Sequence, residues 1–151
     1  MSIKATTHWL QGIGFEVEIR DHHQFTDGKK EFGGRDRGPN PKEYVLAGLC
    51  GCTGMDVVSL LKKYKVNYSE FSVTAETELT KNHPVVFTEV TILFSLKAET
   101  QDFEQIKKAV ELSMTKYCGV SAMLSKAVDI RYVVQVNNEE VSSGIAKFET
   151  S

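Results

Sequence analysis

The chain has 151 residues, a formal net charge of -2 at pH 7 and 25% charged residues, which is typical of one globular domain with a substantial hydrophobic core. The slightly acidic balance gives no electrostatic reason to expect a nucleic-acid partner. The first residues, MSIKATTHWLQG, lack the apolar segment of a signal peptide, and three cysteines, an odd number, argue against a disulfide scaffold and favour a reducing cytoplasm.

The N-terminal part predicts three short strands followed by a loop. Residues 4–10 and 14–20 alternate between apolar and polar side chains, which is the period of a half-buried strand. Residues 22–26 add a third strand, which the turn dipeptide Asp27-Gly28 closes. From residue 28 to 40 the sequence GKKEFGGRDRGPN is charged, glycine-rich and without periodicity. It predicts a loop of the kind that carries binding groups beside a rigid helix.

Residues 39–65 predict a long helix around which the rest of the chain is organised. Its apolar side chains are not confined to one stripe, which is typical of a helix buried in a core. Asn40 and Pro41 suit the start of this helix, and Glu43 suits its first turn. Three lysines near the end suit the negative pole of the helix dipole.

The same helix contains the residues with the clearest chemical potential. Glycines, Asp56 and Ser59 interrupt its apolar run, so we expect no membrane-spanning segment. Two thiols, Cys50 and Cys52, lie in its middle, and the third cysteine, Cys118, lies in another apolar helical stretch. The functional question is whether these thiols meet.

The second half predicts a long hairpin and then a helix. Residues 71–78 and 86–96 both alternate with a period of two, so we expect an antiparallel pair. Asp102 followed by Gln105 predicts a capping box. It would begin an amphipathic helix over residues 103–114.

The last part predicts a short helical piece at residues 120–127 and a final strand at residues 130–136. We expect the polar tail from Asn137 onward to fray. The order β-β-(β)-α-β-β-α-α-β indicates an α+β fold, with antiparallel sheets packed around the long buried central helix. The prediction is a single domain over residues 1–151.

Two segments, NPKEYVLAGLCGCTGMDVVSLLKK and KYCGVSAMLSKAVDI, resemble the OsmC/Ohr superfamily. The resemblance covers nearly the whole chain and implies an OsmC-like fold in an intertwined homodimer, with active sites near the subunit interface. In the best-known members, the helix cysteine attacks an organic hydroperoxide and the later cysteine resolves it as a disulfide. The resemblance therefore implies a cysteine-based peroxidase that uses a small-molecule hydroperoxide and a dithiol reductant. We expect no cofactor and no metal.

The resemblance assigns roles to two of the three cysteines. Cys52 in LCGCTGMD matches the reactive cysteine of the family, and Cys118 in KYCGVS matches the resolving one. Cys50 has no counterpart that we assign. The second motif of the family commonly has proline after its cysteine, where this chain has Gly119. The chain is therefore most similar to the less characterised OsmC-like branch.

The charged residues of the family site are not matched position by position. Lys42 stands where the family has a glutamate, so Glu43 is the acid that would serve instead. The arginine that follows the first strand in the family is absent. Arg35 and Arg37, in the loop before the helix, are the candidates to replace it.

The proposed chemistry sets requirements on these residues. The thiolate is the nucleophile, and burial disfavours it, so a working Cys52 needs a cation nearby; Arg35 or Arg37, positioned by Glu43, would supply one. Peroxide oxidation gives a sulfenic acid, which condenses with a second thiol. Cys52 and Cys118 must therefore bring their Cα atoms within about 7 Å.

Two other interpretations stay open at this point. Buried cysteines often only fill space, and the protein could be a non-catalytic binding or carrier protein with an apolar pocket on the same fold. A metal site at Cys50-x-Cys52 is disfavoured, because no second Cys/His pair has ligand spacing. The apolar helix also predicts a dimer interface well above about 2,000 Å².

Overall fold

The computed structural model describes residues 1–149, which form two compact units, residues 1–45 and residues 46–149. Each unit is described by itself. The N-terminal unit holds β1 (Thr6–Gln11), β2 (Gly14–Ile19) and β3 (His22–Thr26) in an antiparallel sheet of order β1-β2-β3. These are the three predicted strands, two from the alternation and the third from its place before the Asp27-Gly28 turn. Whether both units act as one domain stays a prediction.

The central helix, α1 (Pro41–Lys63), begins with a complete capping box. Asn40 Oδ1 accepts hydrogen bonds from the backbone N–H groups of Lys42 at 3.0 Å and Glu43 at 3.1 Å. Glu43 Oε2 accepts one from the backbone N–H of Asn40 at 2.8 Å. These bonds satisfy donors that the first helical turn would otherwise leave free. The predicted start of the helix is confirmed.

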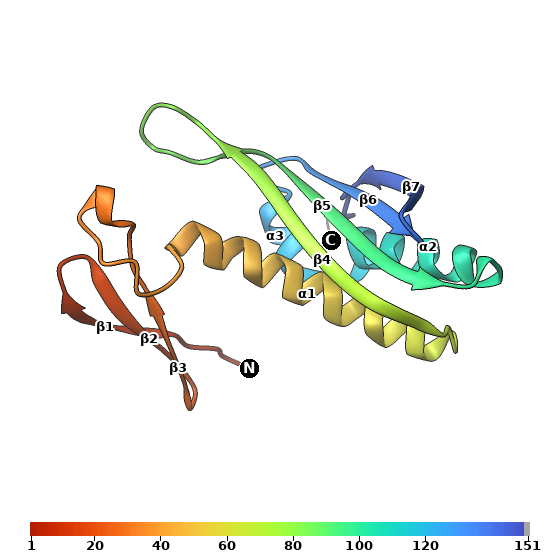
Figure 1. The fold of residues 1–151 in the computed structure, drawn as a ribbon, viewed down its shortest axis with the longest axis horizontal. Helices are drawn as coiled ribbons and strands as arrows, with labels where there is room; N and C mark the ends of the chain where they lie inside the picture. Colours follow the sequence, from red (N-terminus) through yellow and green to blue (C-terminus); the bar gives the residue numbers. More distant parts are fainter. Residues whose placement is uncertain (150–151) are drawn as a thin grey trace. The chain divides into compact units, whose positions relative to one another are not determined.

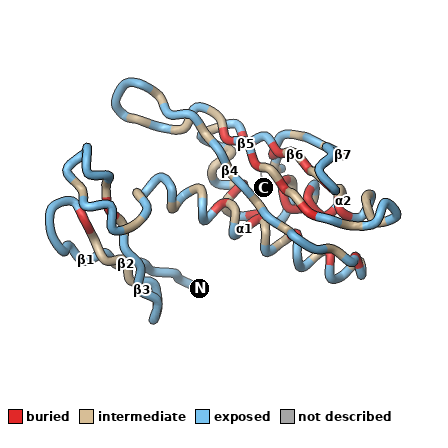
Figure 2. Tube along the Cα trace, in the orientation of Figure 1, coloured by how far each residue is buried: buried red, intermediate tan, exposed pale blue. Residues whose placement is uncertain are grey.

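Within this chain α1 is buried along one stripe only. Its fully buried side chains recur every four residues and belong to Leu49, Thr53, Val57 and Leu61 (Figure 2). The apolar Met55 is 74% exposed. The expectation of a helix buried all round is therefore wrong for the single chain.

The length and composition of α1 alone would allow it to cross a membrane, contrary to our expectation from its interruptions. A core helix of a globular protein passes the same test. The buried stripe of α1 packs into the hydrophobic core of the C-terminal unit, which favours the core assignment.

The C-terminal unit is built on a four-stranded sheet. Its order is β4-β5-β6-β7, and its strands are β4 (Tyr68–Leu79), β5 (Phe87–Ala98), β6 (Ile130–Val136) and β7 (Glu139–Ile145) (Figure 1). The pair β4–β5 is antiparallel, as expected. The pair β6–β7 is also antiparallel, whereas β5 and β6 run parallel. The reason is that helices connect these two strands, and such a crossover returns the chain in the same direction.

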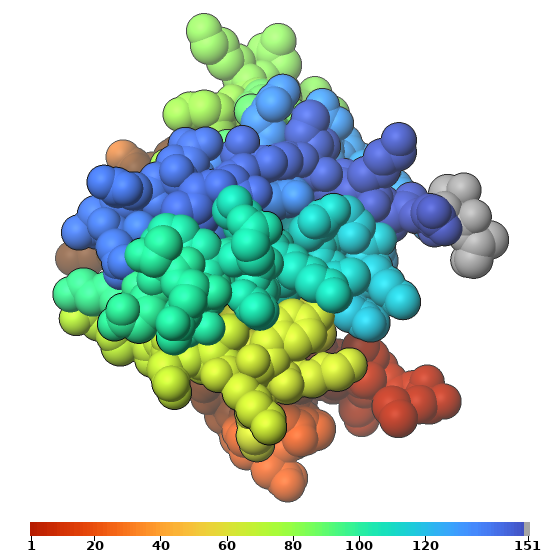
Figure 3. All heavy atoms as spheres, turned by 90° about the vertical axis from the view of Figure 1, so that its right-hand side faces the viewer, coloured from red at the N-terminus to blue at the C-terminus, as the bar shows by residue number. Residues whose placement is uncertain are grey.

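The helices between β5 and β6 cover the core. α2 (Phe103–Leu112) follows the 3₁₀ turn η2 (Thr100–Asp102) and buries Ile106, Ala109 and Val110. The Asp102 side chain makes no capping hydrogen bond, so the predicted capping box is wrong. In the space-filling view, α2 lies between the end of α1 and the strands β6 and β7 (Figure 3).

The expected frayed tail is instead strand β7. Val136 pairs with Glu139 across a two-residue loop, Asn137-Asn138, whose φ angles are 53° and 65°. Two central residues with positive φ are typical of the type I′ hairpin turn, and asparagine tolerates that conformation better than most residues.

Candidate functional site

The C-terminal unit positions Cys52 and Cys118 from different segments. Cys52 lies on α1 and is partly exposed, whereas Cys118 is fully buried. Cys118 directly follows a π-helical segment, η3 (Ser113–Tyr117), and caps the N-terminus of α3 (Gly119–Leu124). Single π-helical turns are rare and occur often at functional sites. The chain is thus locally irregular where the second thiol is placed.

The two thiols lie next to each other, and a carboxylate lies close to both. The Sγ atoms of Cys52 and Cys118 and a carboxylate oxygen of Asp56 all lie within 4.8 Å of one another. Both cysteines are free thiols. The structure therefore brings together the two cysteines that the family resemblance pairs.

The Cys118 thiol is held in its neutral form by its surroundings. Burial raises the pKa of Cys118 to about 11. Ser121 opposes this rise, because its Oγ donates a hydrogen bond to Cys118 Sγ at 3.1 Å and its backbone N–H donates another at 3.3 Å. The neighbouring Cys52 thiol adds to the rise in pKa. Around pH 7, Cys118 is thus a thiol held by two donors.

A hydroxyl network beside the thiols was not anticipated from the sequence. Ser113 Oγ donates to Asp56 Oδ2 at 3.0 Å and lies 2.7 Å from Thr53 Oγ1. Thr53 and Ser113 are fully buried. In the sequence, Asp56 stands out only as an interruption of an apolar run. The available signal was its spacing, because residues i and i+4 lie on one helix face, which places Asp56 beside Cys52.

Cys50 faces another part of the unit. Two residues along an α-helix correspond to a rotation of about 200°, so Cys50 and Cys52 point to nearly opposite sides of α1. Burial raises the pKa of the Cys50 thiol, while a contact with the backbone of Ala75 in β4 lowers it. Cys50 therefore lies on the sheet side of α1, away from Cys118.

The loop of the N-terminal unit is organised by a buried aspartate. Asp27 is 4% exposed and accepts hydrogen bonds from the backbone N–H groups of Gly28, Arg35 and Arg37. Burial alone would raise the pKa of Asp27, but these donors and the Arg37 guanidinium lower it below its ordinary value. The Asp27-Gly28 pair that we predicted as a turn thus anchors the whole loop.

This loop distinguishes the two candidate arginines. Arg37 Nε lies 3.5 Å from Asp27 Oδ2, and a Cβ atom at Gly14 would come within 2.7 Å of the Arg37 guanidinium. Within residues 1–149, the Arg35 side chain makes no ion pair. Glu43 uses one carboxylate oxygen in the helix cap and is not the ion-pair partner of Arg37.

Cys52, Asp56 and Cys118 also have the donor types of a zinc site. They supply three ligands, whereas structural zinc sites use four. The Ser121 hydroxyl already donates to the Cys118 sulfur and the Ser113 hydroxyl to an Asp56 oxygen, and these hydrogen bonds are compatible with thiol chemistry. The ligand set therefore does not displace the redox interpretation.

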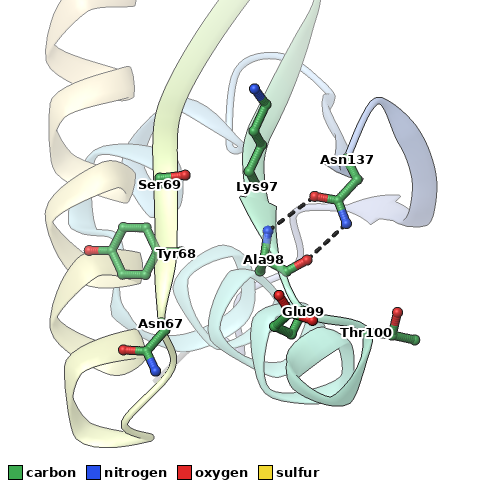
Figure 4. A pocket seen from close by; sticks show the side chains of 8 residues that line it. All are labelled: Asn67, Tyr68, Ser69, Lys97, Ala98, Glu99, Thr100 and Asn137. Carbon is green, nitrogen blue, oxygen red and sulfur yellow. Dashed lines mark hydrogen bonds between the residues drawn. The ribbon is translucent and has the colours of Figure 1, made fainter.

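Three surface hollows of the C-terminal unit are lined by neither Cys52 nor Cys118. One of about 470 Å³ lies at the ends of β4 and β5 (Figure 4). There the Asn137 side chain accepts a hydrogen bond from the Ala98 backbone N–H at 3.1 Å and donates one to the Ala98 carbonyl at 2.8 Å. The lining residues, which include neither Cys52 nor Cys118, are Asn67, Tyr68, Ser69, Lys97, Ala98, Glu99, Thr100 and Asn137.

Comparison with known proteins identifies a family and a fold. Residues 33–133 match a family described as OsmC-like protein. The chain is 33% identical over 135 residues to Protein YhfA of Escherichia coli, covering 89% of this chain and 98% of YhfA.

Solved structures of other proteins have the same fold as this chain. An OsmC-like protein from Mycoplasma pneumoniae superposes with a TM-score of 0.78 at 12% identity, covering 90% of this chain and 97% of the other. An organic hydroperoxide resistance protein from Elizabethkingia anophelis gives a TM-score of 0.67 at 21% identity, covering 91% and 97%. These two likenesses concern the fold, and with the family match they show that this chain belongs to the OsmC-like protein family.

Proposed function

We propose that this protein is a thiol-dependent peroxidase that reduces organic hydroperoxides. The observation that supports this function best is the pair of free thiols, one partly exposed on α1 and one buried, with sulfur atoms within 4.8 Å of each other. A disulfide requires a sulfur separation of about 2.05 Å, so the pair needs only a small movement to close. A neighbour in fold is named an organic hydroperoxide resistance protein, which supports the same class of substrate.

The reaction balances with the residues of this pair. The Cys52 thiolate attacks the hydroperoxide, the O–O bond breaks, and an alcohol leaves after taking up a proton, so that Cys52 becomes a sulfenic acid. The Cys118 sulfur then displaces the hydroxyl group as water, forming the Cys52–Cys118 disulfide. A dithiol reductant returns both thiols to the reduced state by exchange.

Turnover of a defined hydroperoxide tests this function. Reduced protein is mixed with cumene hydroperoxide and dithiothreitol, and loss of hydroperoxide is followed against dithiothreitol alone. We expect many equivalents of hydroperoxide to be consumed per chain. Consumption no faster than dithiothreitol alone would contradict the peroxidase function and would favour the carrier interpretation.

We infer that the active form is a homodimer, because a second copy would cover the apolar face that α1 leaves exposed. Within the C-terminal unit the exposed apolar side chains include Met55, Val58, Tyr117 and Met123. Light scattering at micromolar concentration should give twice the 16.9 kDa mass of the chain. Met55→Glu should shift the mass toward the monomer, whereas the control Glu104→Lys, at an exposed site on α2, should not. A monomeric wild-type protein would contradict the dimer.

We propose as a separate, untested prediction that Arg35 or Arg37 favours the thiolate of Cys52; within the N-terminal unit, Arg37 is already paired with Asp27. Alkylation of Cys52 by iodoacetamide is measured across pH. Alanine at the responsible position should move the alkylation midpoint upward by at least about one pH unit, which corresponds to about 1.4 kcal/mol of lost interaction. Arg35→Ala and Arg37→Ala, the second of which also removes the ion pair with Asp27, are compared. If neither variant moves the midpoint, neither arginine activates Cys52.

The cytoplasmic location of the protein also stays a prediction.

A further inference from the structure

The resolving step requires a proton acceptor. Burial raises the pKa of Cys118 to about 11, so at pH 7 only about one molecule in 10,000 carries the thiolate at this position. The Ser121 hydroxyl and N–H donate to the sulfur, and neither is a base at neutral pH. For Cys118 to attack a sulfenic acid at a useful rate, another group must take its proton.

Asp56 is placed to be that group. It stands four residues after Cys52 on α1, so the two side chains lie on the same helix face. One of its carboxylate oxygens lies within 4.8 Å of both the Cys52 and the Cys118 sulfur atoms. That separation is within reach of a single bridging water molecule or a small side-chain rotation. No other carboxylate belongs to this cluster within residues 1–149.

Buried hydroxyl groups hold Asp56 in this place. Ser113 Oγ donates to Asp56 Oδ2 at 3.0 Å, and Thr53 Oγ1 lies 2.7 Å from Ser113 Oγ. Because the single proton of Ser113 is used on Asp56, Thr53 is the donor in its contact with Ser113. The Ser113 proton therefore points at the carboxylate and the Thr53 proton at the Ser113 oxygen, so the two hydroxyls hold the Asp56 side chain in position.

The lysine of η3 is directed toward an aromatic ring. On η3, the Nζ atom of Lys116 lies 5.4 Å from the centroid of the Tyr117 ring, and Tyr117 is 50% exposed. The titratable groups within the thiol cluster are thus Cys52, Cys118 and Asp56.

We propose that Asp56 is the proton carrier of disulfide formation, an inference that rests on the proposed peroxidase function. As the S–S bond forms, the Cys118 proton passes to the Asp56 carboxylate. The S–O bond of the Cys52 sulfenic acid breaks at the same time, and the departing hydroxyl takes this proton from Asp56 and leaves as water. Asp56 ends each cycle as it began, and no further oxidant or reductant is needed.

Asp56→Asn tests the proposal, because the amide keeps an acceptor for Ser113 but cannot take up a proton. The protein, in a Cys50→Ala background, receives one equivalent of cumene hydroperoxide. The sulfenic acid and disulfide are then quantified by quenched alkylation and mass spectrometry. We expect sulfenic acid formation to continue and disulfide closure at pH 7 to slow at least about 100-fold. Closure should recover about tenfold per pH unit toward pH 11, where Cys118 ionises without help.

Two variants separate proton transfer from packing. Ser113→Ala keeps the Asp56 base but removes its donor, so closure should slow less and keep the wild-type pH profile. Glu104→Gln changes an exposed acid on α2 and should have no effect. The Asp56 proposal is overturned if Asp56→Asn closes as fast as wild type, or if its closure stays slow at high pH. If wild type forms no sulfenic acid at all, the peroxidase function itself fails, which is a different result.

Discussion

Replacing Cys52 by serine should reduce hydroperoxide consumption to the level of the dithiol alone, a loss of at least about 100-fold. A serine hydroxyl is not ionised near neutral pH and is not oxidised by peroxide, so the first step has no nucleophile. The measurement is the turnover assay with cumene hydroperoxide and dithiothreitol, at equal concentrations of folded protein.

Cys50→Ala is the matched control for this substitution. Cys50 lies on the same helix, is also partly buried and lies on the sheet side of α1. Its replacement should cost on the order of 1 kcal/mol in the free energy of unfolding and leave most of the activity. Equal losses from Cys50→Ala and Cys52→Ser would mean that packing of α1, and not the Cys52 thiol, controls the reaction.

Replacing Cys118 by serine should separate oxidation from resolution. Cys52 can still attack the hydroperoxide, but its sulfenic acid has no thiol within reach to condense with. Mass spectrometry after excess hydroperoxide should show Cys52 carrying one, then two or three added oxygen atoms. Turnover with dithiothreitol should fall, because the reductant must reach a partly buried sulfenic acid directly.

The fate of Cys52 in this variant distinguishes resolution from simple packing. Wild-type protein treated in the same way should lose two hydrogen atoms and gain no oxygen. If Cys118→Ser and wild type accumulate the same oxidised forms, Cys118 does not protect Cys52.

Local patterns in the sequence were enough for much of the fold. The strands around the N-terminal turn and the long hairpin follow from alternation, and the start of α1 follows from the Asn40-Pro41 signal, because such features depend on neighbouring residues. The parallel pairing of β5 with β6 depends on where the chain returns after two helices. That placement is a property of the packed core and not of either strand.

Two errors have specific local causes. The tail beyond Asn137 has weak apolar alternation, but its two adjacent asparagines form the turn that returns β7 to the sheet. At Asp102 the sequence matches a capping box, yet its backbone angles of -95° and -2° are helical. A capping residue needs an extended backbone. Asp102 cannot have one because it belongs to the 3₁₀ turn η2.

The candidate site could be predicted only in part. Family resemblance paired Cys52 with Cys118, although 65 intervening residues separate them in the sequence. Asp56 and Ser113 were missed, because their contact depends on the π-helical turn that sets the position of Ser113 and Cys118 relative to α1. Asp56 had one signal in the sequence, its i, i+4 spacing from Cys52, whereas Ser113 had none.

Peptide mapping after a single oxidation tests the central claim most directly. Fully reduced wild-type protein is treated with one equivalent of cumene hydroperoxide, blocked with iodoacetamide and digested. We expect one cumyl alcohol and one Cys52–Cys118 disulfide per hydroperoxide consumed, with Cys50 recovered in alkylated form. Recovery of Cys52 and Cys118 as alkylated thiols, or a disulfide that contains Cys50, would contradict the account.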